Sequence, residues 1–139
     1  IPFVDLIQTS FVINEGMPDY IYNRIKEISP RLNNVLILGA AFKKGCDDTR
    51  NSLAFKMKKV CEKHGVTVCM EDPHVELPPQ KSLHISEYDA VIVMTPHTET
   101  EISWPLSQFR KNCIIADLWK MYPESKLSNT GIYKIGDML

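Results

Sequence analysis

The sequence predicts an α/β fold in which a Rossmann-like, doubly wound parallel sheet is preceded by a helical segment. Short, continuous apolar runs such as residues 35–38 and 90–94 are typical of strands buried on both faces, which belong to parallel sheets. Segments with helical spacing of apolar residues alternate with these runs, as they do in α/β proteins. The chain has 139 residues, of which 44% are hydrophobic and 24% charged, as expected for one globular domain.

The N-terminal segment is predicted to consist of two helical pieces. The first piece carries apolar residues at helical spacing, namely Phe3, Val4, Ile7 and Phe11. Gly16 is expected to end it, because glycine adopts the left-handed C-terminal conformation without steric cost. Met17-Pro18 begins the second piece, and Pro30 stops it.

The first helical piece also bears on the domain organisation. It is rich in apolar residues, which are expected to pack on residues outside this segment. The chain opens with Ile1-Pro2 and has no initial methionine, so we expect it to be an internal piece of a longer protein.

The other elements follow as strand, helix, strand, loop, strand, helix and strand. Strands are expected at residues 35–38, 66–70, 90–94 and 113–116, with a short final strand at 131–135. Helices are expected from a cap at Ser52 to His64-Gly65, and at residues 104–109. Right-handed crossovers bring the carboxyl ends of the strands in such a Rossmann-like sheet to one edge, where ligands bind. Candidate residues therefore lie at 42–50, 72–74, 95–97 and 117–119.

Charge and cysteine content exclude several classes of partner. The net charge of −1 gives no general attraction for nucleic acid or for an anionic membrane, and no apolar run approaches the roughly 20 residues of a membrane span. The four cysteines, at 46, 61, 69 and 113, form no CxxC pair. We therefore expect reduced thiols in a cytoplasmic protein and no metal centre.

The loop at residues 39–52 differs from a dinucleotide-binding turn. It lacks the GxGxxG pattern that lets backbone approach a pyrophosphate, and it is too long for that turn. It carries Lys43, Lys44 and Arg50, which could grip a diphosphate through charge-assisted hydrogen bonds. The alternative is that the two lysines are solvated and that Arg50 pairs with Asp47 or Asp48.

This loop resembles the segment that opens the C-terminal domain of UDP-glucose/GDP-mannose dehydrogenases. The matching residues are Leu38-Gly39, Ala41, Phe42, Lys43, Asp47-Asp48, Arg50 and Ser52. Further segments are similar to the family in the same order: Asn14 with Met17-Pro18, Asp72-Pro73-His74, and Asp89-Ala90 with Thr95-Pro96-His97. The agreement in order and spacing extends over about residues 10–119.

The resemblance implies an enzyme that oxidises the C6 alcohol of a UDP- or GDP-sugar in two steps to a carboxylate and reduces NAD. It implies that a separate N-terminal domain holds NAD. It also implies that residues 1–16 are the end of an inter-domain central helix and that residues 17–139 form the C-terminal domain, which binds the nucleotide of the sugar. Phe42 and Lys43 match substrate-binding positions, and Arg50 matches a position that reaches toward the cofactor. The nucleophilic cysteine of the family lies upstream, so no catalytic residue is expected here. The chain alone should be inactive, and the full-length enzyme is expected to be a homodimer.

Some residues depart from the family or belong to no motif. Asp117-Leu118-Trp119 stands where many members have Asp-x-Arg, so that one substrate contact is absent or is replaced by Lys120. Cys46 lies among cations, which favour a thiolate, yet no motif marks it as a nucleophile. His74 and His97 close strands at the ligand edge, where either could bond a nucleotide, but we expect surface histidines at strand ends. Trp104 and Trp119 are expected to be core or rim residues and not base-stacking platforms.

Two other classes of protein share this fold. A signalling receiver domain needs an acidic pair directly at the end of its first strand, whereas Asp47-Asp48 lie several residues beyond it. A standalone, non-catalytic module that binds a nucleotide or a protein stays open as the alternative function.

Overall fold

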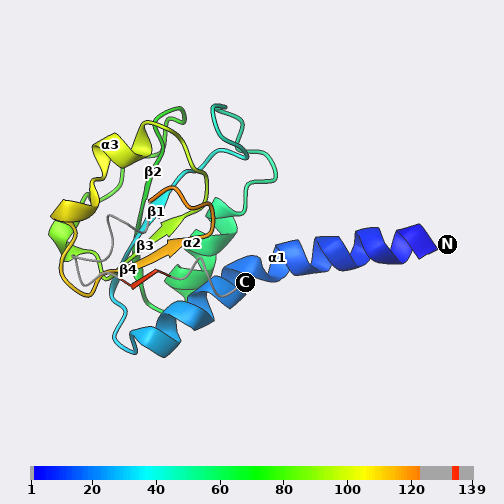
Figure 1. The fold of residues 1–139 in the computed structure, drawn as a ribbon, viewed down its shortest axis with the longest axis horizontal. Coiled ribbons are helices and arrows are strands. Elements are labelled where there is room, and N and C mark those ends of the chain that lie inside the picture. The colour runs from blue at the N-terminus through cyan, green and yellow to red at the C-terminus, as the bar shows by residue number, and fades with distance from the viewer. Residues whose placement is uncertain (1, 123–132, 135–139) are drawn as a thin grey trace.

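The computed structural model describes residues 2–122 and 133–134. The helices are α1 (Pro2–Ile28), α2 (Ala54–Lys63) and the short α3 (Thr100–Ser103), and 3-10 turns lie at Ile85–Glu87 and Leu106–Gln108. The strands are β1 (Asn34–Leu38), β2 (Thr67–Glu71), β3 (Ala90–Val93), β4 (Ile114–Asp117) and β5 (Tyr133–Lys134). They form one parallel sheet in the order β2-β1-β3-β4-β5 (Figure 1), which confirms the predicted doubly wound α/β class.

The sheet is covered on both faces because successive side chains of a strand point in opposite directions. On one face, Val35 and Ile37 of β1 pack in a cluster with Ile25 of α1 and Met57 of α2. On the other face, Leu36 and Leu38 pack with residues from the 3-10 turns and the segments next to them. All four of these β1 side chains are fully buried, which explains the continuous apolar run in the sequence.

Helix α1 is continuous, so the helix end predicted at Gly16 is wrong. Gly16 has no positive φ, and Pro18 lies inside the helix. A single glycine and a single proline each cost helix stability, but packing of the second half outweighs that cost, since Ile21 and Ile25 are almost completely buried. The first half extends away from the sheet (Figure 1) and exposes its apolar side chains: Phe3, Val4, Leu6, Ile7, Phe11, Val12 and Ile13.

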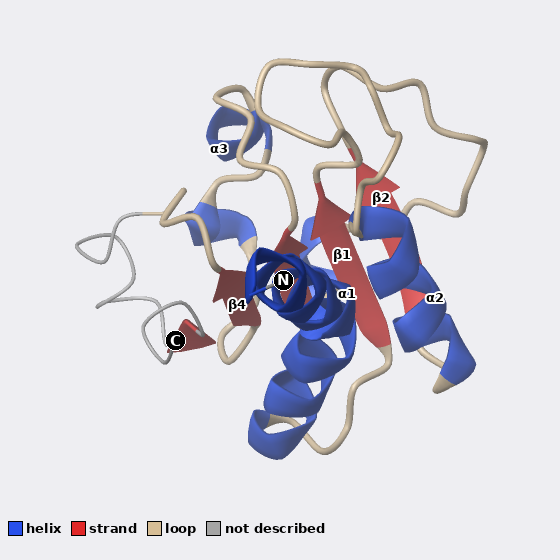
Figure 2. Cartoon of the chain, turned by 90° about the vertical axis from the view of Figure 1, so that its right-hand side faces the viewer, coloured by secondary structure: helices blue, strands red, loops and turns tan. Residues whose placement is uncertain are grey.

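The strands β2, β3 and β4 and the helix α2 agree with the predictions to within a residue. The final strand expected at 131–135 is described only at Tyr133–Lys134, and the rest of that range lies outside the described residues. The helix expected at residues 104–109 is replaced by α3 and a separate 3-10 turn, because Pro105 interrupts the segment. Figure 2 shows the long loops gathered at the carboxyl end of the strands, as the arrowheads of β1 and β2 indicate. Neither α1 nor the shorter described helices have the length and apolarity needed to cross a membrane.

Candidate functional site

The β1–α2 loop leaves the sheet through Gly39. Its φ of +94° is unfavourable for any other residue, and an added Cβ would lie 2.4 Å from the Cβ of Thr95. The loop then closes on itself, because the Phe42 N–H donates to the Asp48 carbonyl at 2.7 Å. The Thr95 hydroxyl, which is buried, donates to the carbonyl of Ala41. The backbone that carries Phe42 is therefore fixed from both sides.

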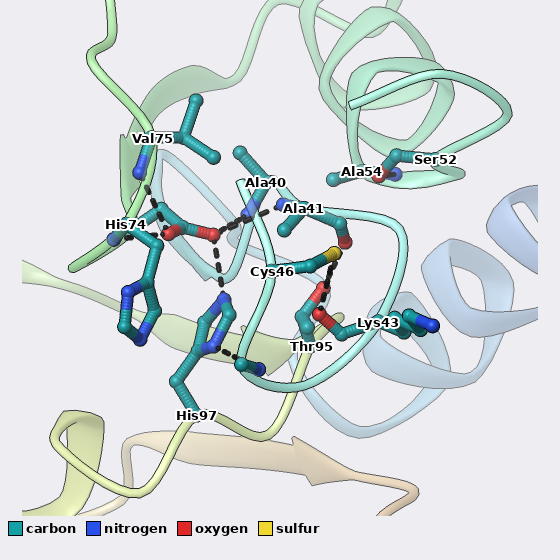
Figure 3. A network of polar contacts seen from close by, with 12 residues as sticks. Ala40, Ala41, Lys43, Cys46, Ser52, Ala54, His74, Val75, Thr95 and His97 are labelled. Atoms are coloured by element: carbon teal, nitrogen blue, oxygen red, sulfur yellow. Dashed lines mark hydrogen bonds and ion pairs between the residues drawn. The ribbon is translucent and has the colours of Figure 1, made fainter. Parts of the chain in front are cut away.

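A buried carboxylate, that of Asp72, joins this loop to the segment after β2 (Figure 3). Its Oδ2 accepts from the N–H groups of Ala40 at 2.7 Å and Ala41 at 3.0 Å. Its Oδ1 accepts from His74 N–H at 2.7 Å and Val75 N–H at 3.1 Å. Burial alone would raise the pKa of Asp72, but the hydrogen bonds that it accepts outweigh burial and lower its pKa. The Asp-Pro-His motif thus holds the loops together.

His97 is fully buried, so the prediction of a surface histidine is wrong at this position. Its Nδ1 accepts from Gly45 N–H at 3.1 Å, and Nε2 lies 2.9 Å from Asp72 Oδ2. Because Nδ1 accepts a hydrogen bond, the proton of the neutral ring is on Nε2, which donates to the carboxylate. His97 therefore connects the tip of the β1–α2 loop to Asp72, and both of its nitrogens are occupied (Figure 3).

His74 is exposed, as predicted, and its Nε2 lies 3.2 Å from the Glu99 carboxylate. Together with His97, these two side chains bring possible metal-ligand atoms within 4.8 Å of one another. A metal ion would have to break one of the two hydrogen bonds of His97. The geometry therefore favours a structural hydrogen-bond network at this position.

A cleft of about 290 Å³ lies between α1, the β1–α2 loop and the segments after β3 and β4. Its lining residues are Asn14, Met17, Ile21, Ala41, Phe42, Asn51, Ser52, Leu53, Val93, Met94, Leu118 and Trp119. Most are apolar, and a few polar groups stand among them, as is typical of small-molecule sites. Phe42 is 60% exposed at this cleft, so the sequence-predicted substrate residue lies where a ligand could reach it.

The lysines of the loop are separated in the structure. Lys43 is exposed, does not line the cleft, and extends away from the His97 network (Figure 3). Lys44 is exposed, in agreement with a solvated loop residue, and it borders a second cavity of about 270 Å³ with Lys120, Trp119 and Glu101. Cys46 is bound to the loop, since its thiol donates to the Lys43 carbonyl at 3.1 Å.

Arg50 is 85% exposed and pairs with Asp48, which is one of the two partners that the sequence offered. Its Nη2 lies 2.7 Å from Asp48 Oδ2, and its Nε lies 3.0 Å from Oδ1. These hydrogen bonds lower the pKa of Asp48 to about 2. Asp47 is exposed and has no partner among the described residues, so Asp48 alone orients the guanidinium.

The described residues do not fit the dinucleotide site of a Rossmann domain. Such a site needs a short glycine-rich turn from the first strand into the N-terminus of the next helix. Here β1 ends at Leu38 and α2 begins at Ala54, with Gly39 packed against Thr95. If Arg50 contacts NAD, the cofactor is therefore held mainly by another part of the enzyme, and Arg50 adds a single contact to it.

A second buried carboxylate, that of Asp117, holds the turn after β4. Asp117 was expected just past the strand, but it is the last residue of β4 and is fully buried. Oδ1 accepts from Trp119 N–H at 3.3 Å and Met121 N–H at 3.0 Å, and Oδ2 accepts from Tyr122 N–H at 2.8 Å. Trp119 is thus displayed on a fixed turn.

The roles of Asp117 and His97 were missed because they depend on burial. A lone polar residue at the end of a strand is more often exposed, and only the strand order shows which loops cover it. Asp72 follows β2 and His97 follows β3. These two strands flank β1 in the sheet, so the segments that follow them can meet across the end of β1. An acidic residue directly after an apolar strand was the available signal in the sequence.

The chain is similar to known sequences and structures of one family. Residues 36–124 match the model of the UDP-glucose/GDP-mannose dehydrogenase family, UDP binding domain. A UDP-N-acetyl-D-mannosamine dehydrogenase of Pyrococcus horikoshii is 32% identical over 107 residues, which cover 71% of this chain and 26% of that protein. A UDP-N-acetyl-D-glucosamine 6-dehydrogenase of Salmonella typhi is 28% identical over 112 residues, covering 70% of this chain and 26% of that protein.

Solved structures agree with the sequence comparisons. The UDP-N-acetyl-mannosamine dehydrogenase of Staphylococcus aureus superposes with a TM-score of 0.76 at 26% identity, covering 96% of this chain and 34% of that one. The Pyrococcus horikoshii enzyme superposes with a TM-score of 0.72 at 28% identity, covering 94% of this chain and 33% of that one. The chain therefore spans about a quarter to a third of the length of the relatives that it matches.

Proposed function

The chain belongs to the UDP-glucose/GDP-mannose dehydrogenase family, whose UDP binding domain it matches, and on this premise we propose that it binds the nucleotide of a sugar substrate for an NAD-dependent 6-dehydrogenase. The supporting observation is the cleft at the carboxyl end of the parallel sheet. Most of the residues that line the cleft lie within the matched residues 36–124, and Phe42 is exposed in the cleft. This edge of a doubly wound sheet is where ligands bind.

The residues divide into those that hold the loops and those that are free to meet a ligand. Phe42 and Lys43 are the proposed substrate-binding residues, on a loop that Asp72 and His97 hold in place. Phe42 lines the cleft, whereas Lys43 is its exposed neighbour outside the lining and is proposed to meet the part of the nucleotide sugar that extends beyond the cleft. Arg50 is the proposed cofactor contact, because its guanidinium is exposed and oriented by Asp48.

The rest of the proposed enzyme lies outside this chain. NAD and the nucleophilic cysteine belong to a separate N-terminal part, and the whole enzyme is a homodimer of the cytoplasm. Three buried free cysteines support a reducing compartment. The chain alone is expected to give no NADH when it is mixed with NAD and a UDP-sugar.

The sugar is proposed to be an N-acetylated hexosamine carried on UDP. The two sequence relatives described above act on UDP-N-acetyl-D-mannosamine and UDP-N-acetyl-D-glucosamine by name. A stronger response to these two substrates than to UDP-glucose or a GDP-sugar, measured with the full-length enzyme, would support the assignment. A preference for UDP-glucose or GDP-mannose would contradict it.

Calorimetric titration of UDP into the 139-residue chain tests the binding function. Lys43→Ala is expected to weaken binding about ten- to a hundredfold, because it removes a charge-assisted hydrogen bond to the nucleotide. Lys59→Ala is the matched control, since Lys59 is an exposed lysine of α2 away from the cleft. Equal losses in both variants that vanish at high salt would indicate general charge attraction and contradict a specific role for Lys43.

A further inference from the structure

Trp119 is an exposed aromatic side chain on a rigid turn, which is unusual for a residue of this size. Its exposed fraction is 58%, close to the 60% of Phe42, and both side chains line the same cleft. Neither ring contacts another aromatic ring of the described chain. The two rings are therefore open to a ligand in the cleft.

The turn that carries Trp119 is held by buried groups and does not depend on the tryptophan itself. The Asp117 carboxylate accepts the N–H groups of Trp119, Met121 and Tyr122, and Tyr122 is fully buried. Lys120 has a φ of +55°, which a non-glycine residue adopts only where its surroundings enforce it. Keeping a large apolar ring in water on such a fixed turn points to a binding role.

The chemistry of the cleft changes on the two sides of Trp119. The cleft of about 290 Å³ has an apolar floor that includes Val93, Met94 and Leu118. Trp119 also borders the second cavity of about 270 Å³, which Lys44 and Lys120 line together with Glu101. An apolar space next to a lysine-bearing space matches the base and the diphosphate of a nucleoside diphosphate.

The edges of the cleft carry groups that can pair with a base. Asn14 and Asn51 line it, and their side-chain amides make no hydrogen bond within the described part of the chain. An amide offers both donors and an acceptor, as base edges require. The volume of about 290 Å³ lies just below the range of about 300–1,000 Å³ for ligand sites, so it suits a nucleoside better than a whole nucleotide sugar.

We propose that Trp119 is the surface on which the base of the nucleotide stacks, with Phe42 as the second aromatic wall of the cleft and the diphosphate directed toward Lys44 and Lys120. This inference rests on the proposed nucleotide-binding function and adds a residue that determines how the base is held.

Tryptophan fluorescence provides a direct test, because the chain contains two tryptophans. Trp104 packs with Tyr88 and Phe109, so Trp104→Phe keeps an aromatic ring there and leaves Trp119 as the single tryptophan, which is excited selectively at wavelengths that tyrosine does not absorb. UDP is expected to quench Trp119 in this variant at the concentrations at which calorimetry records binding. Inorganic pyrophosphate, which has no base, is expected to leave the emission of Trp119 unchanged.

Affinity provides the second readout. Trp119→Ala is expected to weaken UDP binding about 5- to 150-fold, because one base–aromatic stack is lost. Trp119→Phe should retain affinity within about threefold, since a stacking surface remains, and Trp104→Phe should match wild type. Circular dichroism of each variant checks that the fold is retained. If Trp119→Ala does not fold, the fluorescence measurement still tests stacking, because it keeps Trp119.

The outcomes separate this inference from the proposed function. UDP binding that neither changes Trp119 emission nor weakens in Trp119→Ala would overturn the stacking role and leave the nucleotide site standing. Quenching by pyrophosphate equal to that by UDP would also overturn stacking. Failure of both UDP and GDP to bind the wild-type chain at millimolar concentration would overturn the proposed function and the inference together.

Discussion

Among single residues, Asp72 connects more of the site than any sequence-predicted ligand residue. Its side chain is fully buried and accepts backbone hydrogen bonds from the loops after β1 and β2, as well as one from His97. Asp72→Asn removes the charge and replaces one acceptor oxygen with an NH₂ group that faces other donors. We expect it to lower the free energy of unfolding by about 2–4 kcal/mol in urea denaturation. Asp47→Asn is the control and should change it by less than about 0.5 kcal/mol.

The pH dependence of this effect has a defined sign. Because folding lowers the pKa of Asp72, its stabilising contribution is present above the ordinary carboxyl pKa of about 3.9 and is lost as the pH falls through the lowered value. The stability difference between wild type and Asp72→Asn should therefore be constant near neutrality and shrink below about pH 4. A difference that grows in acid would contradict the assigned direction.

Arg50 is expected to act on turnover and not on folding. Its guanidinium is exposed, so Arg50→Ala should leave the thermal midpoint of the chain unchanged. In the full-length enzyme we expect kcat to fall about tenfold or more with little change in KM, since the proposed partner is the cofactor. A rise in KM with unchanged kcat would instead assign Arg50 to uniform substrate binding.

The sequence predicted the exposed positions of the loop better than the buried ones, while the binding roles of these residues stay predictions. Phe42 and Arg50 follow a strand in a recognisable motif, and the structure places both on the loop at the carboxyl edge of the sheet. His97 was assigned to the surface because nothing near it in the sequence reports that Asp72 and Gly45 approach it from two other segments. Contacts made through strand order leave no local pattern in a single sequence.

At the scale of elements, α1 allows a direct test of why the predicted helix end is absent. An added Cβ at Gly16 meets nothing within 4 Å, and its backbone has no positive φ. Gly16→Ala should therefore raise the free energy of unfolding by about 0.5–1 kcal/mol, because alanine loses less backbone entropy in a helix. Thermal unfolding followed by circular dichroism measures the change.

Gly65→Ala is the contrasting variant. Gly65 also has open space around it, but its φ is +77°, so an L-residue there is strained by about 1–2 kcal/mol. Stabilisation by Gly16→Ala together with destabilisation by Gly65→Ala would show that conformation, and not packing space, separates the two glycines. A destabilising Gly16→Ala would mean that α1 bends or ends at this residue in solution.

The strands were predictable and the helices less so, for a physical reason. A buried parallel strand needs apolar residues on both faces, and residues 35–38 satisfy this without interruption. Helix ends depend on a balance between local propensity and tertiary packing. In α1 the packing of Ile21 and Ile25 outweighs Gly16 and Pro18, whereas Pro105 interrupts the helix expected at 104–109 although Leu106 and Phe109 are buried.

At the scale of the whole molecule, the first half of α1 is the main exposed apolar surface of the described chain. Ile7 and Phe11 lie one turn apart and are 69% and 63% exposed. We expect the isolated chain to self-associate through this surface. The variant Ile7→Lys with Phe11→Lys should elute as a monomer in size-exclusion chromatography with light scattering, with an unchanged thermal midpoint.

Net charge does not explain that result, since two added positive charges move it only from −1 to +1. Gln8→Lys is the control, because it adds charge on the same helix and removes no apolar side chain. If this control dissociates the chain as well as the double variant does, the association is electrostatic and the apolar surface is not its cause.

The buried carboxylates of Asp72 and Asp117 have a consequence for how the protein can evolve. Apart from the His97 ring, both hold their loops through backbone N–H groups, including those of His74 and Trp119, whose side chains are exposed. Every residue except proline carries such a group. Mutation can therefore replace the side chains that face the cleft while the supporting hydrogen bonds remain. Substrate preference can then change without loss of the loop structure.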